Sequence, residues 1–442
     1  MTVDLRSLPD PLPIEPLAGP LHATVEVPGS KSITNRALVC AALAHGTSVL
    51  EGALHAEDTE AMVHGLQAMG VEIHTDWPNG RVTVTGVAGR PPSPLSLVDA
   101  RLSGTTSRFL LPVAGLGDGT TRVDGALPLR NRPMGPVVAA LRRLGAEVRE
   151  VGAADHLPIE VSGGPMAGGV VELPGDTSSQ FLSGLLLAGP AMRTGLTVVC
   201  TTELVSRGYV DMTVAVMAAF GVEVDQPDDR TWVVAPDDYQ GTTYRVEPDA
   251  SAASYAFAAA ALAGGAVTVA GLGTPSLQGD LEFVEHLRRM GAEVERAADR
   301  TTVRRTGPLV GIDEDLSQES DIAQTLAVVA TAATTPTRVN GIGFIRAKET
   351  DRVGNVVLEL RRLGIEAVEE PDGYVVHPGT PQPGTVATYE DHRMAMAFAL
   401  LGLVAPGIAI DDPGCVAKTF PGYWDLLGQL RAQSGPANVQ PS

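Results

Sequence analysis

One short phrase recurs along the chain and limits the folds that are open to it. Its five copies read LQAMGVEI, LRRLGAEV, MAAFGVEV, LRRMGAEV and LRRLGIEA, at residues 66–73, 141–148, 217–224, 287–294 and 360–367. Each copy is typical of a helix end, a glycine and the start of a strand, because glycine adopts the left-handed conformation that closes a helix. The copies lie about 70–76 residues apart by subtraction, and a weaker sixth copy covers 426–435. The chain is therefore predicted to repeat one α/β unit.

A second recurring element lies between these phrases: a polar start, a helix of small residues and a strand. Six copies are present, GSKSITNRALV, SGTTSRFLLPV, DTSSQFLSGLL, DASAASYAFAA, ESDIAQTLAVV and YEDHRMAMAFA, which begin at residues 29, 103, 176, 249, 319 and 389. Six units in 442 residues favour two domains of three units each, since so long a chain exceeds one ordinary core. The alternative is that the repeats arose by duplication and serve only the stability of the fold.

The spacing of the helix starts predicts how the chain divides between the two domains. The first unit's helix begins at residue 29 and the fourth at residue 249, so crossovers are expected near Val27 and Val246. One domain would comprise 1–27 plus 247–442, and the other would be an inserted domain, 28–246. The N-terminal strand is then expected to belong to the C-terminal domain. The chain end from Ala432 to Ser442 is expected to fray.

The starts of the six small-residue helices carry most of the chemistry that the sequence offers. A helix N-terminus has unsatisfied N–H groups and a partial positive charge, so it attracts anions. Serine, threonine and aspartate are also ordinary N-caps, which is the simpler reading of any one start. The residues at these starts are Lys31, Ser32 and Arg36; Ser103, Thr105 and Arg108; Ser178, Ser179 and Gln180; Asp249 and Ser251; Ser320 and Asp321; and Asp391, His392 and Arg393. Six polar starts, three of them with added cations, favour a shared anion site.

Further cations lie on the connecting segments, at Arg130, Arg132, Arg346, Lys348, Arg352 and Lys418. The chain has 52 acidic residues and a formal net charge of −20, so local basic runs stand out. The overall charge argues against a nucleic-acid partner. The alternative to an anion site is that these cations lie on a solvated surface. The segment RAKETDR could then be a plain helix with i,i+4 charge pairs.

Other site classes find no support in the sequence. GSKS lacks the first glycine of a phosphate-binding P-loop, and the nine histidines do not cluster with cysteine at metal-ligand spacing. Three cysteines argue against a disulfide framework, the N-terminus does not resemble a signal peptide, and no run is long and apolar enough to span a membrane. We therefore expect a cytoplasmic protein that positions anionic substrates, with proton transfer by carboxylates and lysine.

Seven motifs, in order, resemble those of the 5-enolpyruvylshikimate-3-phosphate (EPSP) synthase family: PGSKSITNRAL, SSQFLSGLL, ASAASYAFAAAAL, SDIAQTLA, RAKETDRV, YEDHRMAMAFAL and KTFPGYW. The resemblance covers about Leu17 to Leu427. It implies a two-domain inside-out α/β barrel, each domain a threefold repeat of βαβαββ-type units, with the active site in the interdomain cleft. It also implies a monomer without metal or cofactor that joins phosphoenolpyruvate to shikimate 3-phosphate in aromatic amino acid biosynthesis.

The resemblance also implies a role for individual residues. The expected catalytic residues are Asp321 as base for the attacking hydroxyl, Glu349 for proton transfer, Lys348 and Lys31. Shikimate 3-phosphate would be bound by Lys31, Ser32, Arg36, Ser178, Ser179, Gln180, Ser206, Asp321 and Lys348. Phosphoenolpyruvate would be bound by Lys31, Gly104, Arg132, Gln180, Arg352, Arg393 and Lys418.

The chain departs from the family pattern at two places. The usual NAGT loop reads LSGTTSRF, with Leu102 in place of an asparagine and Phe109 where proline is common. This loop affects tolerance of the inhibitor glyphosate in the family. Phe344 replaces an asparagine that contacts shikimate phosphate in many relatives.

Two other functions are compatible with the pattern. The UDP-N-acetylglucosamine enolpyruvyl transferases share the implied fold, but they commonly use a loop cysteine within about 116–132, where this chain has none. A non-catalytic anion-binding paralogue would be expected to lose a proton-transfer residue, yet Asp321, Lys348 and Glu349 are all present.

Overall fold

The computed structural model describes residues 4–93 and 95–435. The chain forms two compact units. Unit 1 takes in the chain up to Pro28 and from Pro248 onward, and unit 2 is Gly29–Glu247. The chain changes unit after residues 28 and 247. The expected crossovers, after residues 27 and 246, are each one residue too early.

Unit 2 contains three four-stranded sheets of the same topology, with orders β14-β3-β5-β4, β6-β7-β9-β8 and β10-β11-β13-β12. In each sheet the first two strands of the order are parallel and the other pairs are antiparallel. The strands are β3 (Thr47–Glu51), β4 (Glu72–Asp76), β5 (Arg81–Thr85), β6 (Leu95–Asp99), β7 (Thr120–Asp124), β8 (Glu147–Glu150), β9 (Ile159–Ser162), β10 (Gly169–Leu173), β11 (Leu196–Cys200), β12 (Asp225–Asp228), β13 (Thr231–Val234) and β14 (Thr243–Arg245).

Three helices of unit 2 are almost completely buried: α1 (Lys31–Leu43), α3 (Gly104–Leu116) and α6 (Ser179–Ala188). They are built from small and apolar residues, so they can be covered on all sides. The helices α2 (Glu57–Ala68), α5 (Gly135–Arg143) and α7 (Gly208–Ala219) bury one face only, and a short α4 (Leu127–Arg130) precedes α5. In α5, for example, Val137, Val138 and Leu141 are buried.

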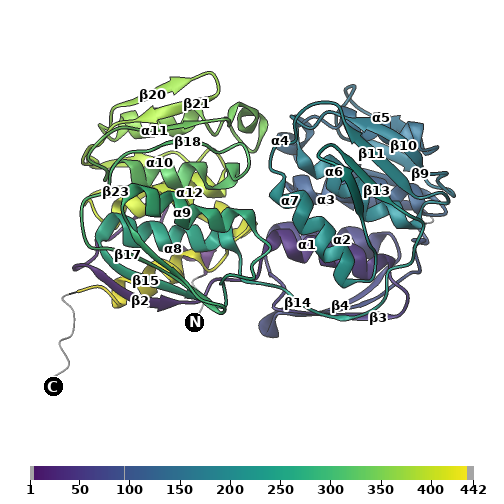
Figure 1. Cartoon of the computed structure of the whole chain (residues 1–442), viewed down its shortest axis with the longest axis horizontal. Coiled ribbons are helices and arrows are strands. Elements are labelled where there is room, and N and C mark those ends of the chain that lie inside the picture. Colours follow the sequence, from purple (N-terminus) through teal and green to yellow (C-terminus); the bar gives the residue numbers. More distant parts are fainter. Residues whose placement is uncertain (1–3, 94, 436–442) are drawn as a thin grey trace. The chain divides into compact units, whose positions relative to one another are not determined.

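Unit 1 repeats this plan in two four-stranded sheets, β16-β17-β15-β2 and β18-β19-β21-β20, while its third sheet, β1-β23-β22, has three strands. Its buried helices α8, α10 and α12 pack side by side, with strands on their outer sides (Figure 1). The elements are β1 (Leu12–Pro13), β2 (Leu21–Val25), α8 (Ala250–Ala263), β15 (Gly265–Ala270), α9 (Phe283–Met290), β16 (Glu293–Arg296), β17 (Arg300–Arg305), β18 (Asp313–Asp315), α10 (Ala323–Ala330), β19 (Thr337–Asn340), α11 (Gly354–Arg362), β20 (Ala367–Glu370), β21 (Gly373–Val376), β22 (Gly384–Val386), α12 (His392–Gly402), β23 (Ile408–Ile410) and α13 (Tyr423–Ala432). Helices inside and sheets outside give the inside-out α/β architecture that the resemblance implies.

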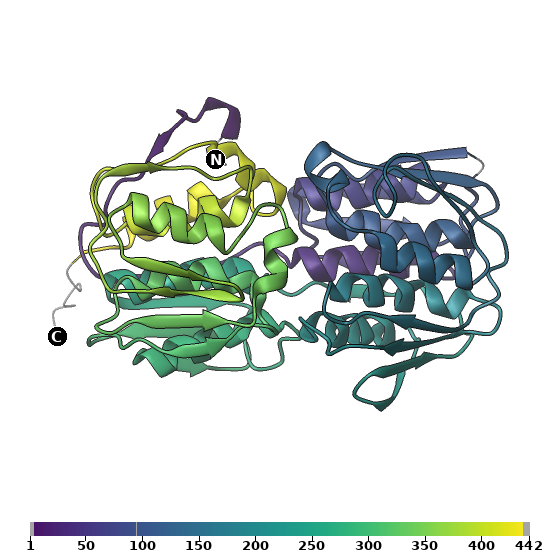
Figure 2. The ribbon, with the colours of Figure 1, turned by 90° about the horizontal axis from the view of Figure 1, so that it is seen from above.

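The strand before each crossing pairs within its own unit. β2, from before the crossing, pairs in parallel with β15 of unit 1, which confirms the predicted place of the N-terminal strand. β14, at the end of the inserted segment, pairs in parallel with β3 of unit 2. β1 pairs with β23, and Figure 2 shows this purple N-terminal segment beside the yellow part of unit 1.

The five recurring glycines have the conformation that the phrase predicts. Their φ angles are all positive: 93° at Gly70, 97° at Gly145, 92° at Gly221, 109° at Gly291 and 76° at Gly364. Each glycine ends a helix in a left-handed conformation, which is unfavourable for a residue with a side chain.

The end of α13 differs from the other helix ends. The expected fraying from Ala432 is wrong as far as residue 435. Ser434 forms an antiparallel bridge with Leu21, and the Gly435 N–H donates to the Pro20 carbonyl over 3.1 Å. The reason is that β2 has a free edge which this segment covers. Residues 436–442 lie outside the described part of the chain.

Two further features of the described residues bear on the sequence analysis. Cys40, Cys200 and Cys415 are free thiols. None of the described helices combines the length and the apolar character that crossing a membrane requires.

A buried histidine in α9 predicts that stability depends on pH. Burial, aided by Arg289, lowers the pKa of His286 to about 4. The unfolded chain, with a histidine pKa of about 6.5, therefore takes up the proton first as pH falls, and stability is lost between pH 6.5 and 4. His286→Gln should reduce the loss of unfolding free energy between pH 7.5 and 5 by about 2 kcal/mol. Urea unfolding at both pH values measures this, with the exposed His22→Gln as control; equal losses in both variants would contradict it.

Candidate active site

Five of the six buried helices begin with a side chain that caps the first turn. The caps are Ser30, Ser103, Ser178, Asp249 and Asp391, which accept from backbone N–H groups of the first helical turn at 2.9–3.4 Å. This confirms the predicted helix starts and satisfies donors that would otherwise be orphaned. The sixth start differs: a 3₁₀ turn, Ser320–Ile322, precedes α10, and no side chain caps it. Asp321 is instead engaged by cations.

In unit 2, the first two turns of α1 supply two of the predicted cations. Lys31 lies 3.6 Å from the buried carboxylate of Asp58. Arg36 is buried and donates to Thr213 Oγ1 at 2.7 Å, to the Tyr209 carbonyl at 2.9 Å and to the Ser32 carbonyl at 2.8 Å. Burial lowers the pKa of Arg36 to about 10, so it stays charged at neutral pH. Arg36 thus joins α1 to α7 and holds the turn that carries Ser32.

The starts of α3 and α6 are joined by a second arginine. Arg108 Nη1 donates to Gln180 Oε1 at 2.8 Å, and Gln180 Nε2 lies 3.4 Å from Thr105 Oγ1. These contacts orient the Gln180 amide. Arg108 is a residue that the family assignments omitted, although its place in SGTTSRF was a signal.

Gly104 and Arg132 lie against each other in unit 2. A Cβ added to Gly104 would lie 2.8 Å from Arg132 Nη1, so a side chain there would displace this guanidinium. Arg132 follows α4 and is 7% exposed. Ser179 opens α6, while the buried Ser206 precedes α7 with a φ of 53°. The predicted unit 2 residues therefore all lie at or beside the starts of α1, α3, α6 and α7.

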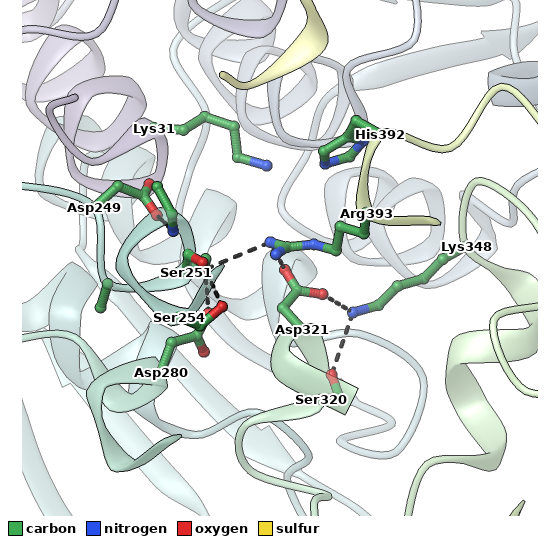
Figure 3. A network of polar contacts seen from close by, with 12 residues as sticks. Lys31, Asp249, Ser251, Ser254, Asp280, Ser320, Asp321, Lys348, His392 and Arg393 are labelled. Carbon is green, nitrogen blue, oxygen red and sulfur yellow. Dashed lines mark hydrogen bonds and ion pairs between the residues drawn. The ribbon is translucent and has the colours of Figure 1, made fainter. Parts of the chain in front are cut away.

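In unit 1, three cations surround Asp321, the residue expected to act as base, and Figure 3 shows two of them, Lys348 and Arg393. Asp321 Oδ1 accepts from Lys348 Nζ at 2.6 Å and from Arg352 Nη1 at 3.1 Å. Asp321 Oδ2 accepts from Arg393 Nη2 at 2.7 Å. Ser320 Oγ adds a second acceptor for Lys348 at 3.2 Å. Asp321, Lys348 and Arg352 belong to the repeat that begins at residue 319, and Arg393 belongs to the next repeat, which begins at residue 389.

The remaining charges of unit 1 extend this network. Arg352 makes two hydrogen bonds to the Asp391 carboxylate, at 2.7 and 3.1 Å, and lies 2.9 Å from Glu349 Oε2. Lys418 Nζ donates to Glu349 Oε1 at 3.0 Å. Asp391 was predicted only as part of a helix start; its role as the buried partner of Arg352 was missed.

Burial and these partners set the proton affinities. Burial opposes the charge of Arg352, but Asp391, Glu349 and Asp321 raise its pKa above the usual value. Burial lowers the pKa of Lys348 although Asp321 acts in the opposite direction. Burial, with Lys418 and Arg393 nearby, holds the pKa of His392 well below its usual value, so this imidazole is neutral at pH 7.

The segment that carries Lys348 is irregular. A 3₁₀ helix spans Gly343–Ala347 and α11 begins only at Gly354, so the reading of RAKETDR as a plain helix is wrong. Lys348, Glu349 and Arg352 nevertheless reach one network, through Asp321 for Lys348 and Arg352 and through the Glu349–Arg352 pair. The ring of Phe344 lies 5.7 Å from Lys348 Nζ, a distance suited to a cation–π contact.

Comparison with known proteins places this arrangement in a family. The family model for EPSP synthase (3-phosphoshikimate 1-carboxyvinyltransferase) matches residues 17–427. The 3-phosphoshikimate 1-carboxyvinyltransferase of Trichormus variabilis is 43% identical over 425 residues, which cover 96% of this chain and 100% of that protein. That of Methanosphaerula palustris is 44% identical over 412 residues, 92% of this chain and 97% of that protein.

A solved structure agrees with these matches. The EPSP synthase of Acinetobacter baumannii superposes with a TM-score of 0.81 at 27% identity, covering 95% of this chain and 97% of the other. The motifs, the threefold repeats and the match over nearly the whole chain therefore lead to one conclusion: this chain belongs to the EPSP synthase family.

Proposed function

We infer that the protein transfers the enolpyruvyl group of phosphoenolpyruvate to the 5-hydroxyl of shikimate 3-phosphate and releases phosphate. The observation that carries this conclusion is the family match over residues 17–427. The charge network of Asp321, Lys348, Glu349, Arg352, Arg393 and Lys418 in unit 1 supports it, because it combines two carboxylates with four cations.

The reaction needs only acids, bases and fixed cations. The 5-oxygen forms a bond to C2 of phosphoenolpyruvate while a proton adds to the methylene carbon. The tetrahedral intermediate then loses phosphate from C2 and a proton from the new methyl group, which restores the enol double bond. Asp321 takes the hydroxyl proton in this proposal, and Glu349 and Lys348 handle the protons of the methylene carbon and the leaving phosphate.

We assign the substrates to the residues that carry suitable charge. Arg352, Arg393, Lys418, Arg132 and Lys31 offer cations to phosphoenolpyruvate, and we assign Gly104 and Gln180 to the same substrate. Lys31, Arg36, Ser32, Ser178, Ser179, Gln180 and Ser206 serve shikimate 3-phosphate, with Asp321 and Lys348 at its reacting hydroxyl. Fixed donors of this kind stabilise the charge that develops in the transition state without reorganising.

We also propose a setting for the enzyme: a monomer in the cytoplasm that acts on small anionic molecules, without a nucleic-acid or membrane partner. The family match supports the small anionic substrates. A single peak of 45.9 kDa by light scattering is the expected result for the monomer.

A phosphate-release assay tests the function. Purified protein should release phosphate only when shikimate 3-phosphate and phosphoenolpyruvate are both present, and omitting either one should stop release. A parallel arm replaces shikimate 3-phosphate with UDP-N-acetylglucosamine. Turnover in that arm alone would identify the sugar-nucleotide reaction instead, and no release in either arm would refute enolpyruvyl transfer.

Replacing Lys31 with alanine should remove activity while the fold is kept. The change deletes a cation assigned to both substrates, and we expect kcat/KM to fall by at least about 10²-fold. A cation in the first turn opposes the helix dipole, so alanine does not weaken α1 itself. The change also removes the 3.6 Å contact with the buried Asp58, so some loss of stability is expected. Circular dichroism checks the fold, and Arg90→Ala, which removes an exposed cation paired with Asp118, is the control. Near-normal turnover by Lys31→Ala would contradict its assignment.

A further inference from the structure

A buried carboxylate in α11 holds the segment that leads into α12. Glu359 is completely buried, and its Oε1 accepts from the Tyr389 hydroxyl at 2.6 Å. Its Oε2 accepts from the Ala387 backbone N–H at 3.1 Å. Arg362, one turn along α11, donates to Oε1 at 2.6 Å. A buried carboxylate is tolerated only when it is fully bonded, so these bonds indicate a fixed arrangement.

The segment that Glu359 holds has an unfavourable backbone. Tyr389 and Glu390 are consecutive and have φ angles of 56° and 57°. This left-handed conformation is costly for residues with a side chain and persists only where the surroundings impose it. Burial and the Glu359 carboxylate raise the pKa of Tyr389 to about 12, so its hydroxyl remains a donor at neutral pH.

The next residue after this pair is the buried Asp391. Its carboxylate caps α12 by accepting from the Arg393 N–H at 2.9 Å, and it binds the Arg352 guanidinium through two hydrogen bonds. Arg352 itself lies just before α11, which carries Glu359. The start of α11 and the start of α12 are therefore joined twice, once by Arg352 with Asp391 and once by Glu359 with Ala387 and Tyr389.

We propose that Glu359 is a positioning residue for phosphoenolpyruvate, which acts by holding the left-handed pair so that Asp391 keeps Arg352 and Arg393 in place. The proposal rests on the proposed function, because these two arginines are the ones assigned to phosphoenolpyruvate. Glu359 touches no substrate in this account. Its effect reaches the site through two bonds to one loop.

Two variants test the proposal in the phosphate-release assay. Glu359→Gln replaces one acceptor oxygen with an NH₂ group that cannot accept, and Tyr389→Phe removes one hydroxyl only. Each should raise the KM for phosphoenolpyruvate about tenfold. The KM for shikimate 3-phosphate should change less than about twofold and kcat less than about threefold, since the base and its lysine keep their contacts. Arg362→Gln, which removes the half-exposed partner of Glu359 and leaves the loop bonds, is the matched control and should leave all three constants unchanged.

A rescue separates positioning from a purely structural role. Asparagine adopts the left-handed conformation more readily than glutamate. Glu390→Asn therefore lowers the cost of the left-handed backbone without restoring the hydrogen bonds to Glu359. Glu390→Asn alone should leave the kinetics unchanged, and in the Glu359→Gln background it should return the KM for phosphoenolpyruvate to within about threefold of the wild type.

The outcomes distinguish the two proposals. A wild-type chain that shows no turnover refutes the proposed function. An active wild type whose Glu359→Gln and Tyr389→Phe variants melt at lower temperature but keep the KM for phosphoenolpyruvate refutes the positioning role. The same holds if both KM values rise equally, or if Glu390→Asn gives no rescue.

Discussion

Asp321→Asn is expected to lower kcat by about 10³-fold, because the amide cannot take the proton of the attacking hydroxyl. The KM for phosphoenolpyruvate should not rise. In the free protein the Asp321 carboxylate occupies Arg393 and Arg352 at 2.7 and 3.1 Å, so its removal leaves these cations more available to an anionic substrate. Steady-state phosphate release with each substrate varied measures both constants.

Asp313→Asn is the matched control for this prediction. Asp313 is an exposed carboxylate on β18 of the same unit and accepts from Asn340 at 3.1 Å. It should keep full activity. If Asp321→Asn retained more than about a tenth of the wild-type kcat, Asp321 would not be the base.

Arg352→Met is expected to lower the free energy of unfolding by about 3–5 kcal/mol, because it leaves a buried carboxylate without its main partner. Asp391 is fully buried, and Arg352 supplies two of its hydrogen bonds. Arg346→Met is the matched control from the same basic run. Arg346 pairs with the exposed carboxylates of Asp351 and Glu369, and such a surface pair contributes about 0–1 kcal/mol. Urea unfolding followed by circular dichroism compares the two variants.

A double-mutant cycle completes this test. Asp391→Asn removes the charge that Arg352→Met strands, so the double variant should be more stable than the single Arg352→Met variant. Equal losses for Arg352→Met and Arg346→Met, or a strictly additive cycle, would show that the Arg352–Asp391 pair does not hold unit 1 together.

Much of the fold could be predicted because its signals are local. A helix cap needs only Ser30 or Asp249 and the next three residues, and a helix end needs only a glycine such as Gly145. Repetition of these signals six times along the chain indicated the repeated units, and the run of motifs indicated the family before any geometry was known.

The site could be predicted as a set of residues but not as a set of contacts. The sequence pointed to Lys348, Arg352, Arg393 and Asp321 separately. It did not indicate that one carboxylate receives all three cations, that Asp391 is the partner of Arg352, or that Glu359 ties the next loop. Nor did it indicate the uncapped start of α10, where the Asp321 side chain is engaged by cations rather than by the helix.

The repeated α/β units, their helix starts and the family of the chain can be predicted from the sequence, because each depends on residues that are neighbours along the chain. Which charges pair depends on the folded arrangement. Arg352 and Asp391 are 39 residues apart, and Arg393 and Asp321 are 72 apart. Coulomb interactions depend on distance in space and on burial, and folding alone sets both for residues so far apart in the chain.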